Sequence, residues 1–455
     1  MKFFRIKIHF AVFLLLLSML CGNMLAAEPI ASGQPLAMAA DDDYTVAAKA
    51  AILVERSTGE VIFAQNADEQ VYPASLTKIM TCLLTLENGN LTDTVTVSES
   101  AMKGLDAAGS TAGLQVGEQI SVENLLYCMM ISSANEACNI AAEYVAGSID
   151  AFVDLMNQRA QELGCTGTHF ANPHGLHDDN HYTTARDLAK IAAAALDNRT
   201  FYNICTTTDY TVPATNLSGP RQLHTTNYLV SDSVTSDYFY ARAKGVKTGY
   251  TSKAGRCLIT TATDGNLSLL SVLCGADTKV MDSGDLVLES FPETKKLCEY
   301  AFDHFDFATV LDAKTPAAQI PVAVAKDAES VVVSPTDSIT KILPVDYDES
   351  LLKTEVHLNN PDGVDAPISA GQILGTITVT YAGAELGTVS LAAITDVERS
   401  EFLYYNRAVQ NFFHNYWALW IILIVLLFVF LFILRYILIN RARRRRAAQR
   451  RRRSK

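Results

Sequence analysis

Ser75 and Lys78 are the first residues of this 455-residue chain whose types and spacing suggest chemistry. They follow Pro73 at the start of a predicted helix that runs to Leu86, and a spacing of three places both side chains on one helical face. A serine hydroxyl needs a base to become a nucleophile, and a lysine whose pKa is lowered by burial can be that base. Backbone N–H groups at a helix N-terminus would favour a developing oxyanion. Alone the pair is weak, because a capping serine before a surface lysine is a commoner arrangement.

Two further motifs follow farther along the chain. Ser133-Ala134-Asn135 lies between two predicted helical segments, and Lys247-Thr248-Gly249 lies on a predicted late strand. Each is weak alone, but the order S-x-x-K, S-x-N, K-T-G is the known motif set of β-lactamases and penicillin-binding proteins. Ala134 stands where that set has aspartate, and the serine and the asparagine are kept.

Longer stretches around these motifs identify a family. They are Tyr72–Thr81, Asn172–Leu176, His181–Asp187 and Val246–Thr251. On these stretches the chain resembles the D-alanyl-D-alanine carboxypeptidases, the low-molecular-mass penicillin-binding proteins of serine peptidase family S11, over about residues 48–396. The resemblance implies an α+β fold. A penicillin-binding/β-lactamase-like transpeptidase domain, with an antiparallel sheet and a helical cluster, would precede a small all-β domain and a C-terminal transmembrane helix.

The resemblance also implies roles for the first two motifs. Ser75 would be the nucleophile, acylated by the penultimate D-alanine carbonyl, and Lys78 would be its base. Ser133 would relay protons, and Asn135 would bind Lys78 and the substrate amide. These three catalytic residues and the asparagine come from two segments that are far apart in the sequence.

The third motif would bind substrate. Lys247 would stay protonated and attract the terminal carboxylate, and Thr248 would donate a hydrogen bond to it. Gly249 belongs to the same substrate-binding strand. The backbone N–H of Tyr250, together with that of Ser75, would form the oxyanion hole.

Several further positive charges lie near this strand in the sequence. Family members often carry an arginine after the last hairpin that helps to hold the carboxylate, and here Asp277–Asp282 offers only Lys279. We expect Arg242 and Lys244, which precede the K-T-G strand, to be surface charges rather than ligand groups.

Three histidines have a spacing that would permit zinc. His174, His177 and His181 enclose Asp178 and Asp179, but the resemblance places this stretch in a structural loop. We therefore predict neither a metal site nor a cofactor.

Both ends of the chain predict contact with a membrane. Lys2, Arg5 and Lys7 precede the apolar run Phe10–Leu20, which is typical of a signal peptide. Its cleavage would fall near Ala26–Ala27 or after Ala39, and Cys21 leaves lipidation as an alternative. Trp417–Leu434 carries no charge and is long enough to span a bilayer. The arginines after it predict a cytoplasmic tail and an external body.

Between the ends, predicted strands flank a run of predicted helices. Ala48–Glu55 with Val61–Gln65, and Arg256–Thr263 with Leu267–Cys274, are expected as hairpins that meet in one antiparallel sheet. The predicted order of regions is a signal peptide at 1–39, a catalytic domain at 40–306, an all-β domain at 307–396, a connector at 397–416, a transmembrane helix at 417–439 and an Arg-rich cytoplasmic tail at 440–455.

Composition limits the partners. The net charge is −12, although the last 21 residues hold ten arginines and one lysine, so an acidic body would repel nucleic acid. The family resemblance implies peptidoglycan stem peptides as substrates and β-lactams as inhibitors, and the apolar C-terminal segment implies the cytoplasmic membrane as a further partner. Eight of nine cysteines follow the signal peptide; Cys82, Cys128, Cys138 and Cys274 lie in apolar runs and are expected to be core residues.

The leading hypothesis is an exported, membrane-anchored serine D-Ala-D-Ala carboxypeptidase acting through an acyl-enzyme. A D,D-endopeptidase, a β-lactamase with the same motifs and a catalytically inactive wall-binding protein are alternatives. The β-lactamase hypothesis lacks a well-placed glutamate between Ser133 and Lys247. Glu355–Asn359 matches an E-x-x-L-N motif of such enzymes, but it falls after K-T-G, and we interpret it as a strand end.

Overall fold

The computed structural model describes residues 44–106, 109–232, 235–281, 284 and 286–453. Two compact units make up the chain. The first consists of Met1–Ala308 with Ile342–Tyr347, and the second of Thr309–Lys341 with Asp348–Lys455. The predicted signal peptide at 1–39 lies outside the described residues.

A five-stranded antiparallel sheet forms the centre of the first unit. Its strands, in the spatial order β2-β1-β9-β8-β7, are Val61–Gln65, Ala50–Glu55, Leu267–Ala276, Gly255–Asp264 and Ala243–Thr251. The predicted hairpins β1–β2 and β8–β9 are both present, and β1 pairs with β9 across more than two hundred residues of sequence. The predicted sheet completed by distant segments is therefore confirmed, and β7 is its edge strand.

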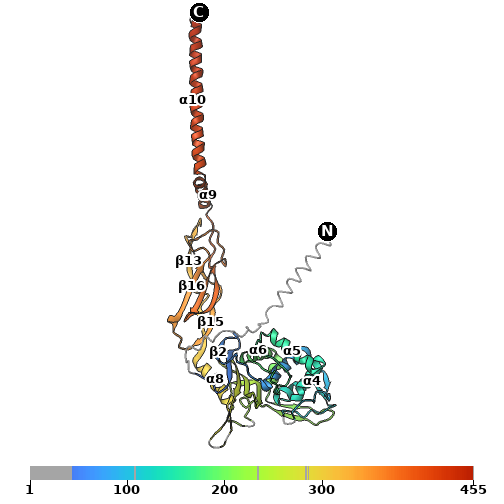
Figure 1. The fold of residues 1–455 in the computed structure, drawn as a ribbon. Helices are drawn as coiled ribbons and strands as arrows, with labels where there is room; N and C mark the ends of the chain where they lie inside the picture. Colours follow the sequence, from blue (N-terminus) through green and yellow to red (C-terminus); the bar gives the residue numbers. More distant parts are fainter. Residues whose placement is uncertain (1–43, 107–108, 233–234, 282–283, 285, 454–455) are drawn as a thin grey trace. The chain divides into compact units, whose positions relative to one another are not determined.

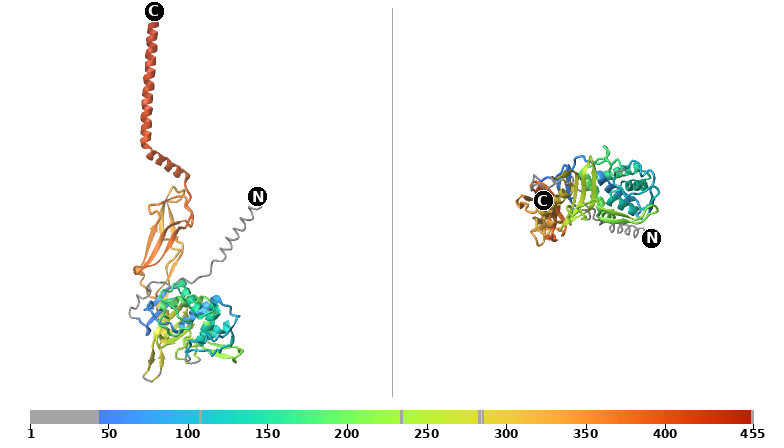
Figure 2. Two further views of the ribbon diagram at one scale, coloured as in Figure 1. Left: turned by 45° about the vertical axis from the view of Figure 1, so that its right-hand side comes forward. Right: turned by 90° about the horizontal axis from the view of Figure 1, so that it is seen from below.

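Helices cover both faces of this sheet. They are η2 (Ala74–Thr77), α2 (Lys78–Asn88), α3 (Val122–Ile131), α4 (Asn135–Ala146), α5 (Ile149–Glu162), α6 (Ala185–Asp197), α7 (Arg199–Thr206) and α8 (Ser290–His304). Helices α4, α5 and α6 lie together on one side of the sheet (Figures 1 and 2), and α8 packs against β8 and β9 from the other. Side-chain caps begin several of them; Thr184, for example, accepts from the Asp187 N–H at the start of α6.

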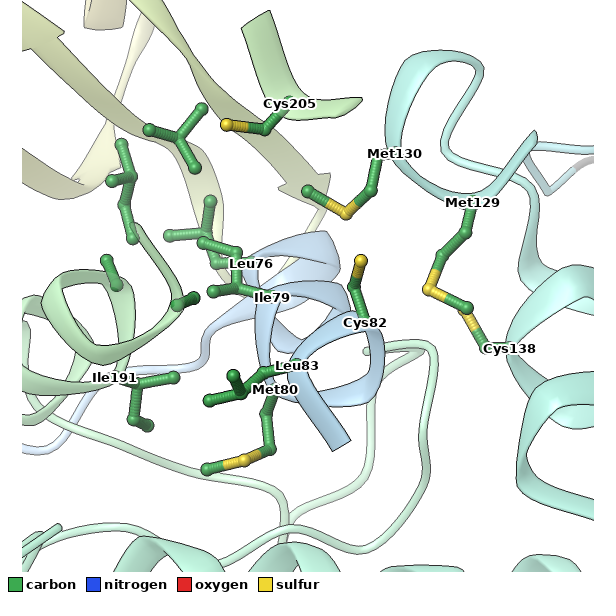
Figure 3. Packing of buried hydrophobic residues seen from close by; sticks show 14 of the residues in the cluster. Leu76, Ile79, Met80, Cys82, Leu83, Met129, Met130, Cys138, Ile191 and Cys205 are labelled. Atoms are coloured by element: carbon green, nitrogen blue, oxygen red, sulfur yellow. The ribbon is translucent and has the colours of Figure 1, made fainter. Parts of the chain in front are cut away.

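Helix α2 runs through the middle of the helical cluster. Its residues from Lys78 to Thr85 are all buried, so this helix has no solvent face in its first two turns. Figure 3 shows its apolar side chains beside Met129 and Met130 of α3 and Cys138 of α4. All eight described cysteines are free and buried, which confirms the four expected in the core. A buried helix of this kind is a rigid support for the residues at its N-terminus.

Three small ribbons and one helix were not expected from the sequence. The ribbons pair β3 (Thr94–Thr96) with β4 (Gln119–Ser121), β5 (Asp209–Val212) with β6 (Arg221–His224), and β10 (Thr278–Val280) with β11 (Leu286–Leu288). These strands have three or four residues each and largely exposed side chains. Such short strands carry no clear alternation of apolar residues. Helix α7 is likewise too short for a strong helical period.

The second unit is built from β-structure. Its six-stranded sheet has the order β16-β18-β19-β14-β13-β17. Strand β12 (Phe305–Leu311) pairs separately with β15 (Ile339–Pro344), and each of these two strands has residues in both units. The six strands are Leu352–Leu358, Ile373–Tyr381, Ala384–Ala393, Ser330–Pro335, Ala318–Ala323 and Val364–Asp365, and η3 (Glu349–Leu351) precedes β16. The predicted small all-β domain is confirmed. Glu355 lies inside β16, which continues to Leu358 and so agrees with a strand end there.

Two helices follow the β-domain. The expected connector contains α9 (Glu401–Asn415), where the Ser400 hydroxyl accepts from the Leu403 N–H at the first turn. Helix α10 (Trp417–Arg453) follows (Figure 1), and its stretch Trp417–Ala448 has a mean hydropathy of 3.2 in its most apolar window. By length and composition this helix is able to cross a membrane. The expected Arg-rich tail is helical as far as Arg453.

Candidate active site

Ser75 lies on a tight turn at the wall of a cleft of about 590 Å³ in the first unit. The turn is η2, and the preceding Ala74 has a φ of +49°, in the left-handed region that L-residues rarely adopt. Strain of this kind is retained at functional positions when packing enforces it. Ser75 is therefore held at the cleft wall one turn before the buried helix α2.

Lys78, the first residue of α2, is fully buried beneath Ser75. Its Nζ lies 2.9 Å from Ser75 Oγ, 2.8 Å from Asn135 Oδ1 and 2.7 Å from the His174 carbonyl oxygen. Burial lowers the pKa of Lys78 to about 8. A neutral amine has two hydrogens, and the amide and carbonyl oxygens can act only as acceptors for them. The remaining lone pair then faces Ser75, which is the geometry of a base beside its nucleophile.

The loop Asn172–Leu176 supplies one of these acceptors. Pro173 O accepts a hydrogen bond from Thr81 Oγ1 of α2, and Asn172 Oδ1 accepts one from the Gly175 N–H. Gly175 has a φ of +84°, and a Cβ there would overlap the carbonyl of Ala74. Only glycine lets this loop pass so close to the turn that carries Ser75. The contact holds the His174 carbonyl against Lys78.

The histidines of this region brace the same turn. His181 Nδ1 accepts from the Ala171 N–H, so its Nε2 carries the proton and donates to Thr77 Oγ1 at 2.7 Å. Burial lowers the pKa of His181 to about 4 and that of His174 to about 3, so both rings are neutral near pH 7. Within the described ranges, no three His, Cys, Asp or Glu side chains are grouped to hold a metal ion. His181 thus binds the Ala171 N–H through Nδ1 and Thr77 through Nε2.

The second motif lies on the same wall. Ser133 is buried, lines the cleft and has a φ of +61°. Helix α3 ends at Ile131 and α4 begins at Asn135, so Ser133 lies between two helices as expected. The unwound backbone lets the Asn135 N–H donate to the Ser110 carbonyl at 2.9 Å, while its side chain reaches Lys78. The turn brings Ser133 and Asn135 together at the cleft.

Lys247 lies on β7, on the side of the cleft opposite to α2. It is almost fully buried, and its Nζ donates to the Thr248 carbonyl at 3.1 Å. Burial, with a further contribution from the charge of Lys78, lowers the pKa of Lys247 well below its usual value. The pKa of Lys247 is thus shifted in the same direction as that of Lys78, and the protonated state of Lys247 stays a prediction. Two buried ammonium groups so close together disfavour one another.

The rest of the K-T-G strand forms the rim. Thr248 Oγ1 is hydrogen-bonded to Thr226 Oγ1. A Cβ on Gly249 would lie 3.1 Å from the Ser75 nitrogen, so the glycine lets β7 run directly past Ser75. Tyr250 follows at the mouth of the cleft, with a side chain that is half exposed.

Every predicted site residue thus belongs to one region of the first unit. Six of the eight predicted site residues line the cleft, and the other two, Lys78 and Lys247, are buried. Arg242 is half exposed and pairs with Asp264 and Glu299, and Lys244 is exposed, so both are surface charges as expected. Lys279, on β10, is exposed and is not part of the cleft wall.

Sequence reasoning missed several members of this wall. Thr226, Arg256 and Ser290 line the cleft, and the His174 carbonyl binds Lys78. A backbone carbonyl that acts as an acceptor cannot be recognised from the sequence, because every residue type has one. Arg256 could have been found, since a hairpin that turns at residues 252–254 pairs Tyr250 with residue 256.

Comparison with known proteins agrees with this geometry. The family model "D-alanyl-D-alanine carboxypeptidase" (Peptidase S11) matches residues 36–278, and "Penicillin-binding protein 5, C-terminal domain" matches 305–399. D-alanyl-D-alanine carboxypeptidase DacF of Bacillus subtilis (strain 168) is 32% identical over 362 residues, covering 78% of this chain and 87% of DacF. DacC of Escherichia coli (strain K12) is 33% identical, covering 81% of this chain and 89% of DacC.

A solved structure shows the same architecture. Penicillin-binding protein 5 from Haemophilus influenzae has a TM-score of 0.58 at 29% identity, over 78% of this chain and 99% of that one. The class defined by fold and motifs is that of the penicillin-binding serine peptidases. Within it, this chain belongs to the S11 family of D-alanyl-D-alanine carboxypeptidases.

Proposed function

We propose that this protein is an exported, membrane-anchored carboxypeptidase that removes the terminal D-alanine from peptidoglycan stem peptides through an acyl-enzyme. One observation carries the proposal. Lys78 Nζ lies 2.9 Å from Ser75 Oγ, while fixed oxygens of Asn135 and His174 occupy its other two directions. A lysine held in this way, with a pKa lowered to about 8, is suited to take the serine proton.

The proposed first half-reaction forms the acyl-enzyme. Lys78 accepts the Ser75 proton as Oγ attacks the carbonyl of the penultimate D-alanine. The backbone N–H groups of Ser75 and Tyr250 stabilise the oxyanion; the close passage of β7 at Gly249 supports this pairing. The C–N bond then breaks, and the proton travels from Lys78 through the Ser133 hydroxyl to the leaving amine of D-alanine.

The second half-reaction returns the enzyme. A water molecule gives a proton to Lys78 and attacks the ester carbonyl, and the shortened peptide leaves as Ser75 regains its proton. Substrate binding would also change the pKa of Lys247. A carboxylate arriving beside Thr248 would favour the charged form of this lysine and raise its pKa towards its usual value.

Mass spectrometry of the intact protein tests the proposal. Wild type and Ser75→Ala are each mixed with penicillin and with a peptide that ends in D-Ala-D-Ala. We expect a stable penicillin adduct and release of one D-alanine for wild type, and neither for Ser75→Ala. Rapid loss of the adduct with penicillin turnover would favour a β-lactamase, and cleavage restricted to cross-linked peptides would favour an endopeptidase. An adduct that persists in Ser75→Ala would exclude Ser75 as the nucleophile.

The proposed topology has its own test. The apolar stretch of α10 and the arginines after it support one span, with the catalytic unit outside and the tail in the cytoplasm. A chain that ends before Tyr416 should be released from cells as an active protein. If this truncated chain stays integral after alkaline extraction, the N-terminal segment or a lipid on Cys21 must anchor it instead.

A further inference from the structure

The cleft has an unusual balance of charge. Its wall is formed mainly by serine, threonine, glycine and aromatic residues, and Arg256 is the one arginine or lysine among the described residues that line it. Lys78 and Lys247 lie beneath this wall and are buried. A ligand entering the cleft therefore meets a guanidinium before it meets either lysine.

Strand register places Arg256 beside the K-T-G residues. On the β7–β8 hairpin, Arg256 is directly opposite Tyr250, and Thr248 lies two residues away from Tyr250 on the same strand. Side chains alternate between the faces of a strand, so Thr248 and Tyr250 share one face, and a directly opposite partner shares it too. Helix α8 covers this face, and its Ser290 and Phe291 line the cleft beside Arg256.

The guanidinium is held in place, and within the described part of the chain its charge has no acidic partner. Its Cζ lies 4.1 Å from the centre of the Tyr250 ring, and its Nε donates to Thr278 Oγ1 at 3.2 Å. Among the described residues, no carboxylate forms an ion pair with it. Arg186 and Arg221 of the same unit, by contrast, each pair with a carboxylate. The terminal nitrogens of Arg256 thus remain available for an anion.

Neither Lys279 nor Lys247 can replace this charge at the wall of the cleft. Lys279 is exposed and outside the cleft wall. Lys247 is buried beneath the wall rather than part of its lining, and burial lowers its pKa. An arginine keeps its charge at any physiological pH, and its planar fork can bind both oxygens of a carboxylate.

We propose that Arg256 binds the terminal carboxylate of the substrate together with Thr248, and so makes the enzyme specific for peptides with a free C-terminus. This inference rests on the proposed carboxypeptidase function. Stacking on Tyr250 fixes the guanidinium at the rim, where it meets the carboxylate first. Lys247 then completes the site from below as the approaching charge favours its protonated form.

A matched pair of substrates tests the inference on the full-length protein. Both are thioesters of the same acyl-D-alanine, and their thiol leaving group carries either a carboxylate (the acid donor) or a carboxamide (the amide donor). Thioesters are reactive enough that both can be followed by release of thiol. Wild type must first turn over the acid donor, and Ser75→Ala must not; failure at this step rejects the proposed function, not the role of Arg256.

Arg256→Gln should then lower kcat/KM for the acid donor by about 10- to 100-fold, the loss expected for a charge-assisted hydrogen-bonded pair. For the amide donor the loss should stay within about threefold, since no charge is recognised there. Arg256→Lys should fall between wild type and Arg256→Gln on the acid donor, because it keeps the charge without the fork.

Lys253→Gln is the matched control. Lys253 is exposed on the turn between β7 and β8 and is not part of the cleft wall. It should leave both rates unchanged. Equal losses of Arg256→Gln on the two donors, or a loss for Lys253→Gln as large as that for Arg256→Gln, would overturn the assignment.

Discussion

The two sides of the cleft give their buried lysines different hydrogen-bond partners. On the α2 side, three oxygens surround Lys78 Nζ, from Ser75, Asn135 and His174. On the β7 side, Lys247 Nζ donates to a single carbonyl, that of Thr248. Both side chains are buried and the pKa of each is lowered, so burial alone does not distinguish them.

The two lysines differ in whether their partners are already present in the free protein. Lys78 has its partners in the free protein, and a preorganised base requires no rearrangement when substrate binds. Within the described residues Lys247 Nζ has one acceptor, the Thr248 carbonyl, and an ammonium in that position is costly until a ligand supplies a negative charge. We infer that the α2 side is built for proton transfer and the β7 side for recognition of an anion.

The largest effect should come from removing the base. Lys78→Ala is expected to lower the rate of Ser75 acylation by about 10²–10⁴-fold for every substrate, charged or neutral, because the proton then has no acceptor. Acylation by penicillin, followed by intact mass over time, measures this rate. Lys244→Ala, an exposed lysine on β7, is the control. If the acylation rate fell only for carboxylate-bearing substrates, Lys78 would act in anion recognition like Lys247, and the proposed contrast between the two sides would be wrong.

The preorganisation of the α2 side can be broken without touching a catalytic group. Gly175→Ala would push the loop away from Ala74 and move the His174 carbonyl from Lys78. A displacement of about 1 Å can cost on the order of 10²-fold in rate, and we expect a loss of that order with a lower Tm.

Gly147→Ala is the matched control for Gly175→Ala. Its φ of +78° is close to the +84° of Gly175, but no heavy atom lies within 4 Å of the added Cβ. It should share the backbone strain and lower stability, yet leave kcat unchanged. Similar losses of activity in both variants would mean that strain, and not the position of the carbonyl, controls the rate.

The anion-binding side should respond to the charge of the substrate. Lys247→Gln is expected to lower kcat/KM for the acid donor by about 10- to 100-fold and to affect the amide donor much less. Lys244→Gln on the same strand is the control. Equal losses on the two donors would leave Lys247 as an electrostatic neighbour of Lys78 with no part in recognition.

The pH profile distinguishes the two lysines with a neutral substrate. As the proposed base, Lys78 would act in its unprotonated form, so lowering its pKa to about 8 would increase the active fraction at neutral pH. With the amide donor, kcat/KM should rise about tenfold per pH unit below pH 8 and level off above it. A lysine with its usual pKa near 10.4 would place this rise more than two units higher. A rate independent of pH between 6 and 9 would argue against Lys78 as the base.

Much of the site was predictable from residue types and order. Ser75 with Lys78, Ser133 with Asn135, and Lys247 are the chemical groups of one known motif set, and the structure brings them to one cleft. Sequence periodicity also predicted the sheet and the helical cluster, because both bury long apolar segments. Short exposed ribbons such as β10–β11 carry no such pattern and were missed.

The sequence by itself determined the family, the order of domains along the chain and the chemical groups available to the cleft. Tertiary structure alone decided how those groups are partnered. The third acceptor of Lys78 is a backbone carbonyl, which every residue type possesses, and its position depends on how closely Gly175 passes Ala74. The orientation of Arg256 depends on strand register and on the Tyr250 ring. Burial and pairing arise from packing between distant segments, and these set the pKa of each lysine.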